Sequence, residues 1–118
     1  MKYLFVLNDP PYGTERSYNG LRLAREMIKD PAKGNEVRVF LLGDAAACAK
    51  GNQKVPQGYY HLESFLKMIA RGGGEIAVCS TCMDARGIAD TELLEGALRG
   101  HLSELAEWTM WADKTLVF

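Results

Sequence analysis

Short apolar runs alternate along the chain with longer segments in which apolar residues recur at intervals of three and four. Runs rich in β-branched and aromatic residues that stop at turn formers are typical of buried strands, whereas intervals of three and four are typical of helices facing a core. The runs predict strands at residues 3–7, 37–43, 75–79 and 114–118. The helical intervals predict helices from about 14 to 29, from about 59 to 71 and from 102 to 110.

Helix ends and two mixed segments complete these predictions. Thr14 is suited to cap the first helix, and Gly72 suits a left-handed residue that ends the second. Residues 45–58 combine a short helical segment with a polar loop. Residues 90–98 fit either a short helix capped by Asp90 or, near their end, a short strand, and both interpretations stay open.

Strands that alternate with helices favour right-handed crossovers and a parallel sheet with helices on both faces. We therefore predict the α/β class, with a three-layer α/β/α architecture and a mostly parallel sheet of about five strands. A chain of 118 residues is near the commonest domain size, so we expect a single domain over residues 1–118.

The composition excludes several functional classes. With 47% hydrophobic and 25% charged residues and a net charge of −1, the chain is an ordinary globular protein without the basic excess of a nucleic-acid-binding domain. No segment approaches the roughly 20 apolar residues of a membrane span, and the N-terminal run is too short for a signal peptide. We therefore expect a cytoplasmic protein that contacts neither nucleic acid nor membrane.

The stretch "VCSTCMDARG" carries two of the three cysteines, Cys79 and Cys82, directly after the third predicted strand. In a reducing compartment a C-x-x-C pair is more often catalytic or metal-binding than a structural disulfide. A thiolate is the reactive form of cysteine, and a helix N-terminus or a nearby cation favours it. Thr81 and Asp84 have the spacing of a capping box. Arg86 is close enough in sequence to face the thiol and favour the thiolate. Asp84 would disfavour the thiolate by charge repulsion unless it pairs with Arg86.

The loop after the first predicted strand lies on the same carboxyl edge, where ligands of open parallel sheets bind. It contains Asp9, Tyr12 and Thr14, together with Asn8 and Glu15. These residues approach the cysteines on one condition, namely that the first and third strands are neighbours in the sheet.

Four interpretations of the C-x-x-C pair compete. A structural zinc site needs four ligands, and Cys48, His61 and His101 are isolated in the sequence, so we expect no metal. A thioredoxin-like dithiol normally follows an early strand and precedes a long helix. In the third interpretation both cysteines are buried packing residues. In the fourth, one of them is a nucleophile that carries sulfur as a persulfide. The motif alone does not choose among them.

Longer stretches of the chain resemble a known family. "PYGTE", "LRLA", "VRVFLLGDA", "GNQKVPQGYYHLESFL", "CSTCMDARGI" and "LSELAEWTMWADKTLVF" occur in an order that resembles the DsrE/DsrF-like family, most closely its YchN-like branch, over nearly the whole chain. The resemblance implies a parallel α/β fold and ring-like oligomers, either homo-oligomers (trimers or hexamers) or mixed hexamers of the DsrEFH and TusBCD kind.

In those sulfur-relay complexes a strand-end cysteine accepts sulfur as a persulfide, and by position in the motif it corresponds to Cys79. The relay subunits lack a cysteine at the position of Cys82, which makes that residue a departure from their pattern. Thiol-disulfide exchange offers a use for it, because attack by Cys82 on a Cys79 persulfide would release sulfide and leave a disulfide.

We therefore expect a sulfur carrier or sulfurtransferase without a cofactor, which exchanges sulfur with donor and acceptor proteins. Cys79 is the expected nucleophile, Cys82 the resolving thiol and Arg86 an electrostatic activator; the expected substrate contacts are Asp9, Tyr12, Thr14 and Asp84. The alternatives are a dithiol-disulfide oxidoreductase and an oligomeric scaffold without cysteine chemistry. Trp108 and Trp111, three apart on the last predicted helix, are either core residues or a subunit contact, and two tryptophans this close favour an interface over a ligand stack.

Overall fold

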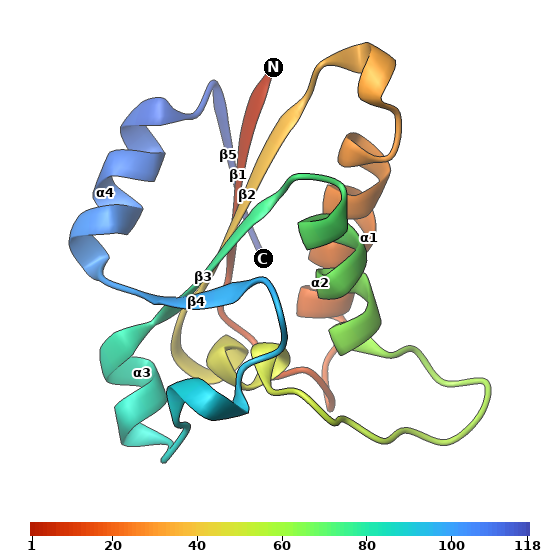
Figure 1. Ribbon diagram of the computed structural model, residues 1–118, viewed down its shortest axis with the longest axis vertical. Helices are drawn as coiled ribbons and strands as arrows, with labels where there is room; N and C mark the ends of the chain where they lie inside the picture. Colours follow the sequence, from red (N-terminus) through yellow and green to blue (C-terminus); the bar gives the residue numbers. More distant parts are fainter.

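Five parallel strands form one sheet through the centre of the molecule (Figure 1). The computed structural model describes residues 1–118. The strands are β1 (Lys2–Leu7), β2 (Glu36–Leu41), β3 (Glu75–Cys79), β4 (Ala97–Gly100) and β5 (Lys114–Val117). Their order across the sheet is β4-β3-β2-β1-β5, and every neighbouring pair is parallel. The predicted fold class is confirmed.

Helices cover both faces of this sheet, as Figure 1 shows. The α-helices are α1 (Arg16–Ile28), α2 (Leu62–Arg71), α3 (Ser80–Ala85) and α4 (Leu102–Trp111), and the short 3-10 helices are η1 (Pro31–Lys33), η2 (Gly43–Ala49) and η3 (Asp90–Glu92). Helices α1 and α2 lie side by side against one face, and α4 lies against the other. The three layers follow from this arrangement.

The two faces of the sheet are buried unequally. Phe5 and Leu7 belong to a core of 21 buried residues under α1 and α2, whereas Leu4 and Val6 belong to a cluster of six buried residues that includes Trp108 of α4. Consecutive strand residues point to opposite faces, so β1 is apolar from Tyr3 to Leu7 because both faces are covered. Each fully buried side chain of this size contributes about 1.5–3 kcal/mol over an exposed one.

Most predicted elements are present, with shifted ends. The second strand stops at Leu41 rather than at residue 43 because Gly43, with a φ of 55°, turns the chain into η2. Both interpretations of residues 90–98 are right in part, since η3 forms at their start and β4 begins at Ala97. The predicted cap is wrong, because Asp90 is the first residue of η3 and Ala89 takes the capping position. The segment 45–58 is η2 followed by a loop that extends away from the body of the molecule.

Two predicted helix ends are wrong. Gly72 has an ordinary φ of −78°, and the left-handed residue is Gly73, with a φ of 93°. The residue that precedes α1 is Glu15 rather than Thr14, although the Thr14 hydroxyl oxygen still accepts a hydrogen bond from the Arg16 N–H at 3.1 Å. The Thr14 side chain therefore still satisfies the first N–H of α1, although Thr14 lies one residue before the capping position.

Strand order decides which loops meet at the carboxyl edge. β2 lies between β1 and β3, so the condition that would have brought the loop after β1 to the cysteines is not met. The segment that follows β2 is instead the neighbour of the end of β3, because Leu41 pairs with Val78.

No helix of the chain is both long enough and apolar enough to span a bilayer.

Candidate functional site

The two cysteines of the motif lie where β3 runs directly into α3. Cys79 is the last residue of β3 and the N-cap of α3, and its Sγ accepts a hydrogen bond from the Cys82 N–H at 3.3 Å. Cys79 is only 8% exposed, and Cys82 is half-buried. An interval of three at a helix start places both side chains on the same side of the first turn.

Cys79 and Cys82 are joined by a disulfide, with their Cα atoms 5.2 Å apart. This separation lies within the range that a disulfide spans without backbone movement. The two sulfurs are therefore within bonding reach of each other. No group of three or more His, Cys, Asp or Glu side chains is placed to hold a metal ion.

Each sulfur is also the acceptor of a backbone N–H. The Gly43 N–H, at the start of η2, points to the Cys82 Sγ at 3.1 Å, while the Cys82 N–H points to the Cys79 Sγ. Backbone donors of this kind stabilise negative charge that develops on a sulfur. Gly43 has a positive φ, which glycine adopts more readily than other residues. The position of this N–H donor therefore depends on a glycine at residue 43.

Arg86 is engaged elsewhere than at the sulfurs. Its guanidinium donates to the Asp44 carboxylate at 2.7 and 3.1 Å and to the Cys82 carbonyl oxygen at 3.1 Å. Asp44 offsets much of its charge, because a paired cation exerts a weaker field on a third group. The role of Arg86 as an electrostatic activator stays a prediction, and the geometry offers it no direct contact with either sulfur.

The predicted capping box is wrong. Helix α3 begins at Ser80, and Cys79 takes the capping position because β3 passes into α3 without a loop. The Thr81 hydroxyl lies 3.5 Å from the Cys79 Sγ, and Asp84 pairs with Arg99 at 3.0 Å rather than with Arg86. Arg99 belongs to β4, and no sequence motif marks it; only the adjacency of β4 to β3 could have identified it.

The loop after β1 is tied to η2 and the segment beyond it, and hydrogen-bonds to neither motif cysteine. Thr14 donates to Asp9 at 2.8 Å, and the Tyr12 hydroxyl donates to Gln53 at 2.9 Å. Burial raises the pKa of the Tyr12 hydroxyl above its ordinary value. Substrate binding by Asp9, Tyr12, Thr14 and Asp84 stays a prediction.

The third cysteine is not part of this arrangement. Cys48 of η2 is fully buried, with its Sγ 3.7 Å from the Asp9 carbonyl oxygen. Burial raises the pKa of the Cys48 thiol to about 12, so it carries no thiolate near neutral pH. Cys48 is a core residue.

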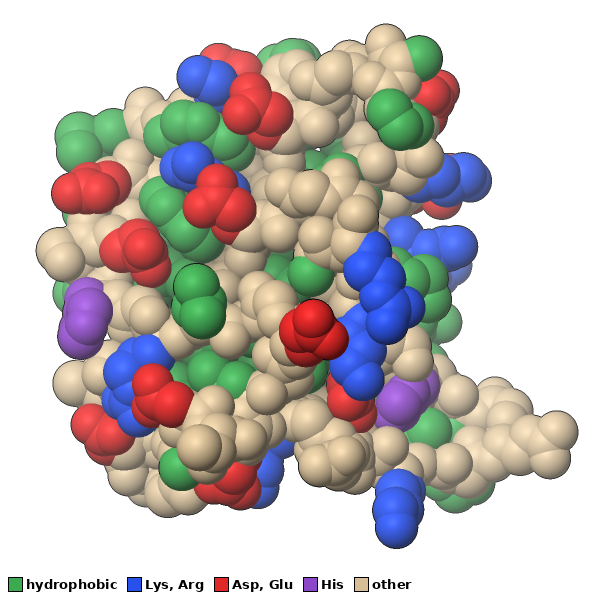
Figure 2. All heavy atoms as spheres, viewed as in Figure 1, with side chains coloured by type: hydrophobic (Ala, Val, Ile, Leu, Met, Phe, Trp, Pro, Cys, Tyr) green, Lys and Arg blue, Asp and Glu red, His purple; other side chains and the backbone are tan.

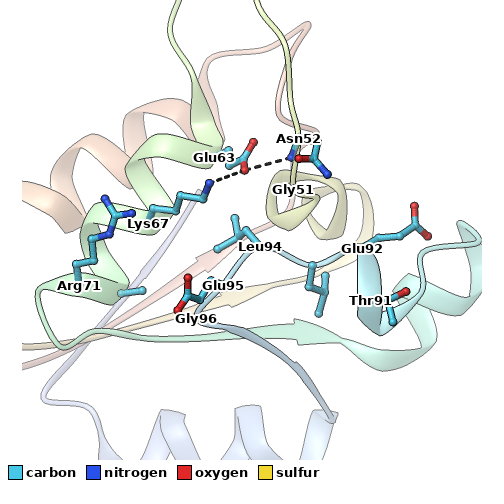
Figure 3. Close-up of a pocket in the computed structure, with 12 residues that line it drawn as sticks. Gly51, Asn52, Glu63, Lys67, Arg71, Thr91, Glu92, Leu94, Glu95 and Gly96 are labelled. Carbon is cyan, nitrogen blue, oxygen red and sulfur yellow. Dashed lines mark hydrogen bonds and ion pairs between the residues drawn. The ribbon is translucent and has the colours of Figure 1, made fainter.

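A polar hollow of about 440 Å³ lies between α2 and residues 91–96, and neither motif cysteine lines it (Figure 3). Lys67 and Arg71 extend from α2, opposite Glu92 and Glu95, and Lys67 pairs with the buried Glu63 at 2.9 Å. Burial would raise the pKa of Glu63, but hydrogen bonds from Lys67 and from the segment after η2 outweigh it, and the net shift is downward. The hollow is separate from the cysteine turn.

Comparison with known proteins identifies the family. The DsrE/DsrF-like family matches residues 1–118, as the sequence resemblance implied. The chain is 37% identical to protein YchN of Escherichia coli over 117 residues, covering 99% of this chain and 98% of that protein. It is 32% identical to an uncharacterised protein of Methanocaldococcus jannaschii over 118 residues, the full length of both.

Solved structures agree with this relationship. The crystal structure of the E. coli ychN protein matches with a TM-score of 0.93 and 36% identity, over 100% of this chain and 99% of that chain. A protein of unknown function from Methanobacterium thermoautotrophicum matches with a TM-score of 0.78 over 99% of this chain and 98% of that chain, and at 12% identity it supports the fold alone. Sequence and structure together show that the chain belongs to the DsrE/DsrF-like family.

Proposed function

We propose that this protein is a sulfur carrier in which Cys79 accepts sulfur as a persulfide and Cys82 resolves it. Membership of the DsrE/DsrF-like family suggests a sulfur-relay role. The observation that carries the proposal is the pair itself: two cysteines within disulfide reach at a strand end, each with a backbone N–H on its sulfur. Such a pair can both hold and release one sulfur atom.

Loading is a displacement at sulfur. The Cys79 thiolate attacks the terminal sulfur of a donor persulfide, the sulfur–sulfur bond of the donor breaks, and the donor leaves as a thiolate. Cys79 then carries a persulfide, and no electrons are gained or lost overall. A donor protein or a small persulfide satisfies this chemistry equally.

Release has two routes. An acceptor thiolate can attack the terminal sulfur, which restores the Cys79 thiolate, or Cys82 can attack the Cys79 Sγ. In the second route the Cys79–Cys82 bond forms, the bond to the terminal sulfur breaks, and hydrosulfide leaves; the terminal sulfur is reduced while the two cysteines are oxidised to a disulfide. A thiol reductant must then restore the dithiol, so we place the reaction in the cytoplasm.

The second route is tested by measuring sulfide. Reduced protein is loaded with a small persulfide, freed of excess reagent, and followed for released sulfide and for the Cys79–Cys82 disulfide. Wild type and a Cys48→Ser control are expected to release sulfide in step with disulfide formation, whereas Cys82→Ser retains its sulfur. Equal release from Cys82→Ser would exclude the resolving role.

A dithiol-disulfide oxidoreductase is the second candidate, and the disulfide itself favours it. In that function the pair exchanges electrons with a substrate disulfide and never holds an extra sulfur atom. Exchange with a peptide disulfide at a rate far above that of free cysteine, combined with no sulfur loading, would select this candidate over the carrier.

We also propose that the chain forms homo-oligomers through α4. Leu102, Ala106 and Met110 recur at intervals of four along this helix; Leu102 is 71% exposed and Met110 is 80% exposed. Figure 2 shows hydrophobic side chains among acidic ones over this helix. Light scattering should find an oligomer for wild type and for Leu23→Glu on α1, and a smaller species for Met110→Glu.

A further inference from the structure

Arg99 lies beside the cysteine turn but on a different strand. It is the third residue of β4, where it pairs with Val78, the residue before Cys79. Its side chain contacts α3 and η3, which contribute Ser80 and Asp90 respectively. The side chain is 24% exposed although it is an arginine on an edge strand. Because so little of this side chain is exposed, its guanidinium is held in one position.

The guanidinium contacts three residues, in two helices, at once. Its Nη1 donates to the Ser80 carbonyl oxygen at 3.1 Å, to the Ser80 hydroxyl at 2.8 Å and to Asp84 at 3.0 Å. Its Nε donates to Asp90 of η3 at 2.8 Å, and Nη2 lies at the same distance from that carboxylate. A planar fork of donors fixes such a geometry, which a lysine would not.

These contacts lie on either side of Cys82. Ser80 follows Cys79 directly, and Asp84 comes two residues after Cys82, so one nitrogen of Arg99 holds the first turn of α3 at both of its ends. The same side chain anchors that turn to η3 and β4. A residue from the neighbouring strand therefore contacts the helical turn that carries Cys82.

We infer that Arg99 is a positioning residue that holds Cys79 and Cys82 at the separation needed for bond formation between their sulfurs. Its use in sulfur release rests on the proposed function, but its effect on the cysteine pair does not. It acts through geometry rather than through charge, because Asp84 and Asp90 already pair with it and leave no excess positive charge.

The test is the equilibrium of the cysteine pair with glutathione, measured in the full chain without any sulfur donor. Two glutathione thiols are oxidised to one glutathione disulfide while the Cys79–Cys82 bond is reduced to two thiols, so the electrons balance. Thiols are trapped by alkylation at a series of glutathione ratios, and the oxidised fraction is read from intact mass.

The expected result is that Arg99→Gln lowers the equilibrium constant for disulfide formation about tenfold, on the scale expected for losing charge-assisted hydrogen bonds. Arg38→Gln is the matched control, because Arg38 is 22% exposed and pairs with Glu75 at the opposite end of β3. It should change the constant less than about twofold, since its contacts do not reach α3.

Three outcomes would overturn the inference. Equal shifts in Arg99→Gln and Arg38→Gln would mean a general loss of stability, and full restoration by Arg99→Lys would mean that charge alone matters. Ser80→Ala removes one acceptor and keeps the arginine, so it should shift the constant in the same direction by a smaller factor even if Arg99→Gln fails to fold; no shift would contradict the positioning role. Failure of sulfur loading would leave all these results unaffected.

Discussion

Glu63 offers the most direct test of how the extended segment after η2 is attached to the body. Its buried carboxylate accepts hydrogen bonds from the Asn52 N–H at 3.2 Å and the Gln53 N–H at 2.8 Å, and it pairs with Lys67 at 2.9 Å. Glu63→Ala removes these three interactions together, and with them the 3.7 Å contact to His61 Nε2. It therefore weakens the attachment of the start of this segment to α2.

The magnitude follows from these contacts. Asn52 is exposed and Gln53 half-buried, so water can replace part of each lost bond, and each costs about 1 kcal/mol, the lower end for an orphaned donor. Loss of the half-exposed Lys67 pair adds up to about 1 kcal/mol. Glu63→Ala should thus lower the free energy of unfolding by about 2–3 kcal/mol, a large share of a typical total.

Urea denaturation followed by circular dichroism measures this change. Glu26→Ala is the control, because Glu26 forms only an exposed pair with Lys29, and its loss should leave the free energy of unfolding unchanged within error. A loss in Glu63→Ala no larger than that in Glu26→Ala would refute the argument.

The same carboxylate predicts a pH dependence. Its pKa in the folded state lies below the ordinary value of 4.5, so the unfolded chain takes up the proton first. The stabilisation from Glu63 is complete well above pH 4.5 and is lost as the pH falls through the lower pKa of the folded state. In Glu63→Gln this part of the acid-induced loss of stability should be absent.

Further predictions concern the motif and the core. Arg86→Gln tests the predicted activation of Cys79: activation requires slower sulfur loading in a mass-spectrometric time course, and a rate within about twofold of wild type would contradict it and would mean that pairing with Asp44 already offsets the charge of this arginine. Cys48 should resist iodoacetamide at pH 8 in the folded protein and react after unfolding, because burial raises its pKa to about 12; modification at the rate of a free thiol would contradict its burial. Gly20→Ala should lower the melting temperature, at a cost of about 1–3 kcal/mol, because its Cβ would meet Leu7 at 2.7 Å.

The position of the cysteines could be predicted from sequence because the evidence for it is local. The apolar run 75–79 ends in Cys79, and strand β3 has those same bounds. Alternating strands and helices likewise predicted the parallel sheet and its layers. Local hydrophobic pattern was enough for these features because burial imposes it directly.

The surroundings of the cysteines could not be predicted, because they come from other strands. Gly43 reaches Cys82 from the end of β2, and Arg99 reaches Ser80 from β4, and both contacts depend on strand order. The spacing of Thr81 and Asp84 satisfied a capping rule, but the absence of a loop after β3 gave that position to Cys79. Local rules place an element and leave its long-range partners undetermined.

The central claim is that Cys79 carries sulfur, and a trapped form of the protein tests it most directly. In Cys82→Ser the resolving thiol is absent, so a persulfide formed on Cys79 cannot be expelled internally. Reduced Cys82→Ser is incubated with a small persulfide, freed of reagent, and analysed by intact mass and peptide mapping. The account predicts one added sulfur atom on the peptide containing Cys79, removed by a reductant and absent when Cys79→Ser is combined with it; no added sulfur on Cys79 would contradict the account.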